Sequence, residues 1–446
     1  MQEQKNKKKL YIETYGCQMN VADSEVVVSL MQEQGYEVTR QMEEASLILV
    51  NTCSIRENAE QRVWGRLNVF RQQKQKHPGV RIGVIGCMAE RLKKQLIERE
   101  KSVDLVVGPD AYRTLPDLLE SVEAGQKGVN TLLSKEETYG DIAPVRTGSN
   151  NLSAFISIMR GCNNMCAYCI VPYVRGRERS RDPQTILQEV KELSQAGYRE
   201  VTLIGQNVDS YLWKGEDGAE AAFDGLLDKV AQVDEAMRIR FATSHPKDLS
   251  DRVLRVMARY PNICRHIHLP VQSGSTRILQ AMNRGYTREW YLNRIEAIRY
   301  YLPDAAITTD IMTGFCGETE EDHQQTLSLM EKAGYDFAYM FKYSERPGTK
   351  AARKMKDDVP EEVKKRRLSE IIDLQNTLSA KSKELAANRT YSVLVEGVSK
   401  KSADEYHGRN SQNQVVVFPK GEARPGDFVR VHVHKATPAT LIGEQV

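Results

Sequence analysis

Three cysteines lie within eight residues near the middle of the 446-residue chain: Cys162, Cys166 and Cys169, spaced Cys-x3-Cys-x2-Cys. Three thiolates this close can hold three corners of one [4Fe–4S] cube. A fourth cysteine does not follow nearby, so one iron would stay open to an exchangeable ligand, like the open position of catalytic zinc sites. The alternatives are a zinc site or a group of buried cysteines. Because zinc favours paired Cys-x2-Cys knuckles, the spacing predicts a cluster.

The run that begins at the second cysteine of the triplet resembles a known family. It reads Cys166-Ala167-Tyr168-Cys169-Ile170-Val171-Pro172-Tyr173-Val174-Arg175-Gly176-Arg177. This run resembles the radical S-adenosylmethionine (SAM) enzymes and, within them, the MiaB-type tRNA methylthiotransferases. The resemblance implies that the open iron binds SAM through its amino and carboxylate groups. It also implies that an electron from the cluster cleaves SAM to a 5′-deoxyadenosyl radical.

Three further cysteines, Cys17, Cys53 and Cys87, each follow a short apolar stretch. We predict strands at residues 10–15, 46–52, 81–86 and 105–108, with helices such as 23–34 and 57–75 between them. Alternating strands and helices favour a doubly wound parallel α/β domain. Ligands bind at the carboxyl ends of such strands, so the three cysteines are expected to converge on a second site. Three buried core cysteines are the alternative.

The resemblance supports the second site. The runs Thr14-Tyr15-Gly16-Cys17-Gln18-Met19-Asn20, Asn51-Thr52-Cys53-Ser54 and Gly86-Cys87-Met88-Ala89-Glu90 are similar to the family's amino-terminal motifs. Those motifs imply an auxiliary [4Fe–4S] cluster held by Cys17, Cys53 and Cys87.

A second alternation of strands and helices covers residues 153–345, after a linker at 136–152 that is rich in glycine, proline and asparagine. Six strand–helix units predict a partial (β/α)6 barrel rather than a closed eight-fold one. The predicted strands are 155–159, 201–205, 239–243, 266–271, 306–312 and 337–343. The cysteine triplet then lies in the loop after the first strand, on the functional face. By resemblance, other loops on that face cradle SAM, and we select Gln206, Ser244, Gln272 and Ser273.

Four arginines at 175, 177, 179 and 181 follow the cluster loop directly. Arginine pairs bidentately with carboxylate and phosphate. The run is therefore expected to contact SAM or substrate, with Arg175 the candidate cofactor ligand, or else to form structural ion pairs. The lone thiols Cys264 and Cys316 are expected to be structural.

The C-terminal part changes character. A basic stretch from residue 350 to 383 is either a solvated connecting helix or a phosphate-contacting one. Beyond it, short strands separated by turns such as Pro425-Gly426-Asp427 predict a small β-barrel, and they resemble the TRAM domain, an RNA-binding module. We predict domains at 1–147, 148–380 and 381–446.

Composition limits the class of protein. Eight cysteines in a chain of this length do not form a disulfide scaffold, and six of them fall into two triplets, which suits a reducing compartment. No run approaches the roughly 18 apolar residues of a membrane span, so we expect a cytoplasmic monomer. The net charge is only +3, so a nucleic-acid surface must be local.

Together these features predict a two-stage reaction. One SAM methylates sulfur at the auxiliary site, a second yields the radical, and the methylthio group joins the activated carbon. By resemblance the acceptor is C2 of N6-isopentenyladenosine beside the tRNA anticodon, with an unidentified electron donor. The alternatives are a sister enzyme acting on threonylcarbamoyl-adenosine or a ribosomal-protein aspartate, and a non-catalytic iron–sulfur sensor that binds RNA.

Overall fold

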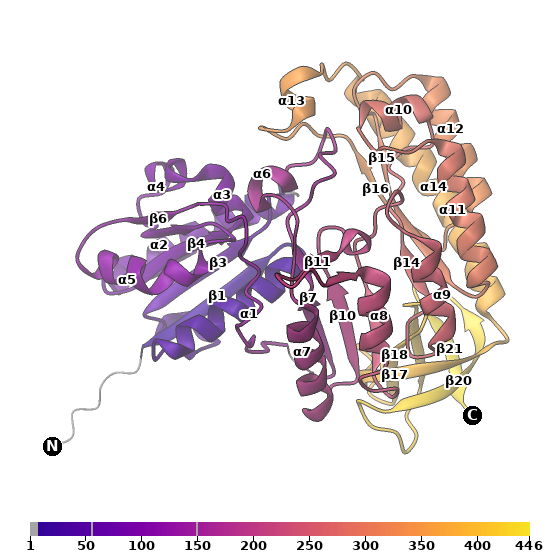
Figure 1. Cartoon of the computed structure of the whole chain (residues 1–446), viewed down its shortest axis with the longest axis horizontal. Helices are drawn as coiled ribbons and strands as arrows, with labels where there is room; N and C mark the ends of the chain where they lie inside the picture. Colours follow the sequence, from indigo (N-terminus) through magenta and orange to yellow (C-terminus); the bar gives the residue numbers. More distant parts are fainter. Residues whose placement is uncertain (1–7, 55–56, 149) are drawn as a thin grey trace.

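The computed structural model describes residues 8–54, 57–148 and 150–446. Residues 1–7 and Ser149 of the expected linker lie outside these ranges. Figure 1 shows an N-terminal α/β domain beside a larger central one, with a small yellow barrel packed against the central domain. Among the described helices, none combines the length and apolarity needed to cross a membrane.

The N-terminal domain is a six-stranded parallel sheet in the order β2-β1-β3-β4-β5-β6. Helices α1 and α5 pack on one face, and α2, α3 and α4 on the other. The predicted doubly wound domain is therefore confirmed. The strands are β1 (Lys9–Tyr15), β2 (Glu37–Val38), β3 (Leu47–Thr52), β4 (Arg81–Gly86), β5 (Leu105–Val107) and β6 (Gly128–Asn130); the helices are α1 (Gln18–Glu33), α2 (Glu57–Lys76), α3 (Cys87–Leu92), α4 (Lys94–Arg99) and α5 (Leu115–Glu123). The edge strands β2 and β6 were not predicted, because β2 has only two residues and β6 contains a single apolar side chain, Val129.

The central domain holds two parallel three-stranded sheets, β7-β10-β13 and β14-β15-β16. A bridge between Ile239 and Ile263 links them, and their outward side chains share one core with the surrounding helices. The six-stranded partial barrel is confirmed. Its strands are β7 (Ser153–Ser157), β10 (Glu200–Ile204), β13 (Arg238–Phe241), β14 (His266–His268), β15 (Ala306–Thr313) and β16 (Phe337–Lys342).

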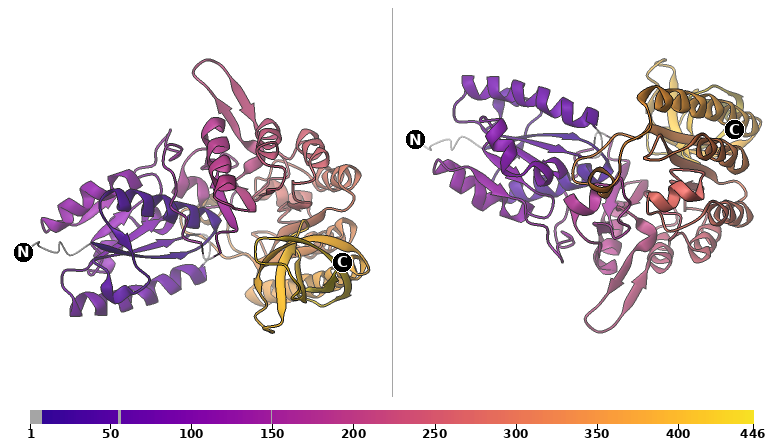
Figure 2. Two further views of the ribbon diagram at one scale, coloured as in Figure 1. Left: turned by 90° about the horizontal axis from the view of Figure 1, so that it is seen from below. Right: turned by 90° about the horizontal axis from the view of Figure 1, so that it is seen from above.

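Helices cover the outer face of this barrel. They are α7 (Pro183–Gln195), α8 (Phe223–Ala231), α9 (Asp251–Arg259), α10 (Thr276–Ala281), α11 (Arg288–Tyr301) and α12 (Glu320–Ala333). Pro183 occupies the first turn of α7, and Asp182 caps it by accepting a hydrogen bond from the Gln184 amide. Two further short strands, β8 (Met159–Arg160) and β9 (Arg179–Ser180), flank the cysteine loop. A hairpin of β11 (Leu212–Lys214) and β12 (Glu220–Ala222), which the sequence did not predict, projects from the domain in both views of Figure 2.

The C-terminal domain is a closed barrel of β17 (Thr390–Val398), β18 (Glu405–Asn410), β19 (Val415–Pro419), β21 (Leu441–Gln445) and β20 (Phe428–Ala436). Arg238 and Arg240 of β13 donate hydrogen bonds of 2.7 Å to the Arg409 and Asn410 carbonyls of this barrel. The barrel therefore closes the amino-terminal end of the central strands and leaves their carboxyl ends free.

The basic stretch forms α13 (Lys350–Lys354) and the long connecting helix α14 (Glu361–Ala386). Within α14, the buried side chains of Lys364 and Arg367 pair with Asp357 and Glu318. Exposed Arg366 pairs with Glu320. These three side chains are therefore engaged in ion pairs, which favours the connecting-helix alternative for this part of the stretch.

Candidate functional site

The three N-terminal cysteines follow strands that end in register. Tyr15 lies opposite Thr52 in the β1–β3 pairing, and Thr52 lies opposite Gly86 in the β3–β4 pairing. Cys53 and Cys87 come one residue later, and Cys17 comes two residues after Tyr15 and caps α1. The parallel register therefore brings the three cysteines to one edge of the sheet, as the strand pattern predicted.

Two glycines make this close approach possible. A Cβ on Gly16 would lie 2.7 Å from the Cys53 Cβ, and one on Gly86 would lie 2.4 Å from the Asn51 Oδ1. Gly86 also has a φ of 87°, a conformation that L side chains rarely adopt. Beneath the cysteines, the Asn20 amide donates to the Asn51 Oδ1 at 2.9 Å. This contact ties α1 to β3 and fixes the cysteine loops.

Arg175 joins the N-terminal cysteines from the central domain. Its Nε donates to the Cys87 Sγ at 3.2 Å, and its Nη2 donates to Asp23 at 2.8 Å. Burial raises the pKa of Cys87, against the charge of Arg175. A hydrogen bond with Cys53, aided by the Arg175 charge, lowers the pKa of Cys17 to about 6. The guanidinium therefore stabilises negative charge on this set, and Arg175 lies with these cysteines rather than with the SAM-loop residues.

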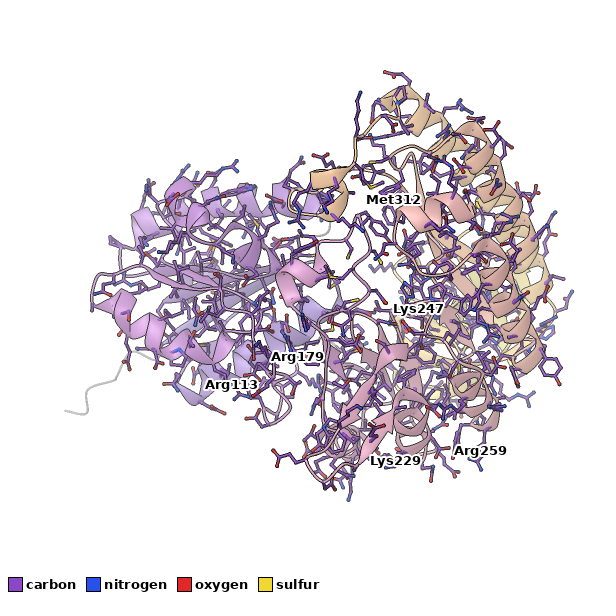
Figure 3. The ribbon with its side chains drawn as sticks, turned by 45° about the horizontal axis from the view of Figure 1, so that its top comes forward. Arg113, Arg179, Lys229, Lys247, Arg259 and Met312 are labelled. Carbon is purple, nitrogen blue, oxygen red and sulfur yellow. The ribbon has the colours of Figure 1, made fainter. Side chains whose placement is uncertain are left out.

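Arg179 of the run and nearby Arg160 tie the two domains together. Arg179 pairs with buried Asp110 at 2.9 Å, and Arg160 pairs with Asp23 at 2.7 Å. Figure 3 shows Arg179 where the N-terminal and central domains meet. Arg181 pairs with Glu189 of α7. The run thus follows the ion-pairing alternative at Arg175, Arg179 and Arg181.

The central cysteines lie in the loop between β8 and α6 (Val171–Arg175). Burial raises the pKa of Cys162 to about 11 and that of Cys169 to about 12, and in both cases neighbouring cysteines of the triplet add to the shift. Arg284 reaches this loop from the segment after α10, and its Nη1 donates to the Cys166 Sγ at 3.3 Å. Arg284 could not be predicted from local sequence, because it lies 118 residues from its partner.

The two cysteine sets are neighbours. Ile170, which directly follows Cys169, shares one apolar cluster with Cys87 and with Val174 of α6. On the other side, Met19 and Ala22 of α1 pack against the barrel residues Phe155, Ile204 and Ala242. The helix that Cys17 begins is therefore seated on the inner face of β7 and β10, which excludes water between the domains.

Neither set is built for a single ion. Ligand atoms of one ion must nearly touch, and among the described residues the sole group of candidate ligand atoms within 4.8 Å of one another is Glu320, His323 and Glu370, which contains no cysteine. A tetrahedral zinc ion with Zn–S bonds of about 2.3 Å would need all three sulfur atoms of a set within 4.8 Å of one another. A [4Fe–4S] cube holds its cysteine sulfur atoms farther apart. Each set also faces a buried guanidinium that complements an anionic cluster, so the residues present fit a [4Fe–4S] group.

Loops on the same face carry buried polar atoms without hydrogen-bond partners among the described residues. They are Gln206 Oε1, Asn207 Oδ1 and His245 Nε2, and they lie beside a buried Asp209 carboxylate that interacts with the Ser244 side chain and the His245 backbone. These atoms follow the neighbouring strands β10 and β13. Burial raises the pKa of Asp209 to about 7 and lowers that of His245 to about 2. Such a set fits a ligand that offers amino, carboxylate and hydroxyl groups, as SAM does. Gln206 and Ser244 were predicted from the sequence, but Asp209 and His245 were not.

Backbone strain marks the same loops. Thr243, directly before Ser244, has a φ of 75°, and Gln272 has a φ of 72°. Strain of this kind costs about 1–3 kcal/mol and clusters at functional sites. Ser273 accepts a hydrogen bond from the Ser275 amide at 3.2 Å and is buried, so it holds its loop in place.

The lone thiols lie outside both sets. Cys264 is buried near Arg238, Arg240 and Ser411, where the barrels meet. Cys316 packs with Phe315 and Tyr343 in an apolar cluster that also includes Ala167 of the central cysteine loop.

Comparisons with known proteins match this architecture in three parts. Residues 9–108 match an uncharacterized protein family, UPF0004, residues 156–330 match the radical SAM superfamily, and residues 386–446 match the TRAM domain. The solved radical SAM methyltransferase TsrM from Kitasatospora setae has a TM-score of 0.60 at 13% identity, covering 78% of this chain and 77% of that one. This likeness shows the fold alone. Fold and superfamily match together define a radical SAM enzyme with a TRAM barrel.

Full-length relatives narrow the class. A protein of Bacteroides fragilis named tRNA-2-methylthio-N(6)-dimethylallyladenosine synthase is 60% identical over 439 residues, covering 98% of this chain and 96% of that protein. A protein of the same name from Christiangramia forsetii is 55% identical over 455 residues, covering 99% and 95%. The chain belongs to this family of radical SAM methylthiotransferases, whose cofactors are two [4Fe–4S] clusters and SAM.

Proposed function

We propose that this enzyme converts N6-dimethylallyladenosine in tRNA to its 2-methylthio derivative, the product in the relatives' name. The observation that carries the proposal is the apolar cluster that Cys87 shares with Ile170 and Val174, which puts a second set of three cysteines beside the radical SAM triplet. An enzyme that only cleaves SAM has no use for that second set. Sulfur insertion at an aromatic C–H requires both a radical source and a sulfur carrier.

We assign Cys162, Cys166 and Cys169 to the cluster that binds SAM, and Cys17, Cys53 and Cys87 to the auxiliary cluster. When bound, these groups and SAM supply the radical, methyl and sulfur chemistry that protein side chains lack. The protein's own side chains orient SAM and exclude water from the site. The unpartnered Gln206 Oε1 and the neighbouring buried Asp209 and Ser244 side chains orient SAM, and strained Gln272 shapes the facing loop.

Substrate delivery falls to the C-terminal barrel. The TRAM match at residues 386–446 supports a tRNA contact there, within our proposed domains 1–147, 148–380 and 381–446. RNA is read best at unpaired loop bases, so the anticodon loop is the expected target. We place the enzyme in the cytoplasm as a monomer that takes electrons from a one-electron donor.

The test is anaerobic incubation of the iron-loaded enzyme with SAM, a reductant and tRNA that carries N6-dimethylallyladenosine, followed by nucleoside mass spectrometry. The expected product is the 2-methylthio nucleoside. Parallel reactions with threonylcarbamoyl-adenosine tRNA and with ribosomal protein test the sister substrates. Product from either of these and none from the dimethylallyl tRNA would overturn the assignment. RNA binding without any deoxyadenosine would instead indicate a sensor.

A further inference from the structure

Strand β16 displays an unusual row of aromatic side chains. Phe337, Tyr339 and Phe341 are 45%, 50% and 42% exposed, although aromatic residues normally bury most of their surface. The residues between them, Ala338 and Met340, pack into the core of the central domain. Because side chains alternate along a strand, the three rings share the opposite face. Phe337 and Tyr339 meet edge to face at 5.0 Å.

That face is the inner one of the partial barrel. In the parallel register Asp310 lies opposite Tyr339, and Met312 lies opposite Phe341. His268 of β14 meets the Tyr339 ring at 5.8 Å. Strand β16 is the outer strand of its sheet and is not hydrogen-bonded to β7 in the described chain, so the row lines the open side of the barrel.

The upper end of the row approaches the radical SAM loop. Met312 packs in a cluster that contains Ala167, the residue after Cys166. The Ala351 amide also donates to the Ala167 carbonyl at 2.7 Å, which binds the segment after β16 to the cysteine loop. Figure 3 shows Met312 between the outer helices and the N-terminal domain. A group lying along the row therefore ends beside the triplet.

The segment that continues from the row is basic. Residues 343–356 contain five basic side chains, Arg346, Lys350, Arg353, Lys354 and Lys356, against one acidic, Glu345. Lys350, Lys354 and Lys356 are exposed, and no ion pair involves them within the described ranges. Aromatic rings beside unpaired basic groups are the combination that binds single-stranded nucleic acid.

We propose that Phe337, Tyr339 and Phe341 form the binding surface for the target nucleotide, stacking on its unpaired purine and packing against its apolar dimethylallyl group, while the basic segment contacts the neighbouring phosphates. This inference rests on the proposed function and names the site that selects its substrate. The rings supply both stacking and apolar area, and His268 with Asp310 supplies the polar edge.

The experiment compares two anticodon stem–loop RNAs, one with N6-dimethylallyladenosine and one with plain adenosine, by fluorescence anisotropy on the loaded enzyme. The variants are Tyr339→Ala, Phe341→Ala and Tyr339→Phe. The matched control is Tyr300→Ala, because Tyr300 is 81% exposed and lies on α11, on the outside of the barrel. Since all these rings are exposed, the variants should fold, and circular dichroism checks this.

Wild type should bind the dimethylallyl RNA more tightly than the plain RNA. Tyr339→Ala and Phe341→Ala should each weaken binding of the dimethylallyl RNA by about tenfold and reduce the preference, in line with the loss of one stacked ring. Tyr339→Phe and Tyr300→Ala should bind like wild type.

Two outcomes would overturn the proposed nucleotide site while leaving the proposed function intact. In the first, wild type makes the methylthio product but binds the two RNAs equally well. In the second, both alanine variants keep the wild-type preference for the dimethylallyl RNA. A third is a change in sedimentation from dimer to monomer in Tyr339→Ala with unchanged RNA affinity, which would make the row an interface between copies. If wild type makes no product from any tRNA, the proposed function itself fails, and binding then reports only on recognition.

Discussion

Each cysteine set contains a buried arginine, and the two sets differ in which groups compensate the positive charge of that arginine. Each has a buried arginine that donates to one sulfur, Arg175 to Cys87 and Arg284 to Cys166. Arg175 also pairs with Asp23. Arg284 instead donates to neutral partners, the Pro270 carbonyl at 2.7 Å and the Tyr286 hydroxyl at 3.0 Å, and it has no carboxylate partner in the described structure.

This difference separates two roles for a buried cation. A buried charge is costly unless an opposite charge compensates it. At the N-terminal set the carboxylate of Asp23 supplies most of that compensation, so Arg175 serves mainly to join the domains. At the central set only the thiolates can supply it, so Arg284 acts on them directly. Hydrogen bonds to cysteine sulfur are among the factors that set cluster potentials.

The largest expected effect comes from removing one cysteine of each set. Cys166→Ala should abolish deoxyadenosine formation and methylthiolation together, whereas Cys53→Ala should spare SAM cleavage and stop methylthiolation. Mass spectrometry of both products tests this. Iron analysis should fall from about eight irons per chain to about four in either variant, as expected for two cubes. Equal loss of both activities in the two variants would contradict separate roles.

Asp23→Asn should destabilise the protein by about 3–5 kcal/mol, because it leaves buried Arg175 without a carboxylate and buried Arg160 with only Asp110 at 3.5 Å. Burial opposes ionisation of Asp23, but the charges of Arg160 and Arg175 outweigh it and hold its pKa below the usual range. Its contribution is therefore complete above the unfolded pKa of about 4 and is lost as pH falls through the folded value. Urea unfolding at pH 7 and below pH 4 measures this, and a deficit that does not shrink in acid would exclude the charge explanation.

Arg284→Gln should lower the midpoint potential of the central cluster by up to about 130 mV, because the lost positive charge favours the more negative reduced state and the full worth of one charge-assisted hydrogen bond, about 1.5–3 kcal/mol, is the upper limit of that preference. The measurement is a redox titration followed by electron paramagnetic resonance, in a Cys17→Ala/Cys53→Ala background that leaves one cluster. Arg175→Gln in the same background is the matched control and should leave this potential unchanged. Equal shifts in both variants would remove the distinction drawn above.

The smallest effect is expected at an ion pair outside both sets. Arg366 pairs with Glu320 and Glu370 where all three side chains are at least one-third exposed, so solvent screens these pairs and Arg366→Ala should destabilise the protein far less than Asp23→Asn. Thermal unfolding beside Asp23→Asn tests this contrast. Similar losses of stability in the two variants would show that the burial of an ion pair does not determine its contribution here.

Local sequence patterns predicted most strands and helices, but they did not predict the charged residues that reach each site from distant parts of the chain. Strands such as β3 and β4 are short apolar runs that end in a cysteine, so both strand and ligand could be read together. Arg284 and Asp23 could not be identified, since their partners lie 118 and 152 residues away. A charged residue inside the apolar face of α1 was the one available signal for Asp23.

The sequence by itself determined the chemistry within each set, because ligand spacing in a loop or at a strand end is a local property of the chain. The sequence also determined that Phe337, Tyr339 and Phe341 alternate with Ala338 and Met340 along β16. Only the tertiary structure decided which face of β16 is exposed, since an edge strand of an open barrel leaves its inner side uncovered. The same long-range packing placed Cys87 against Ile170 and gave each cysteine set its arginine.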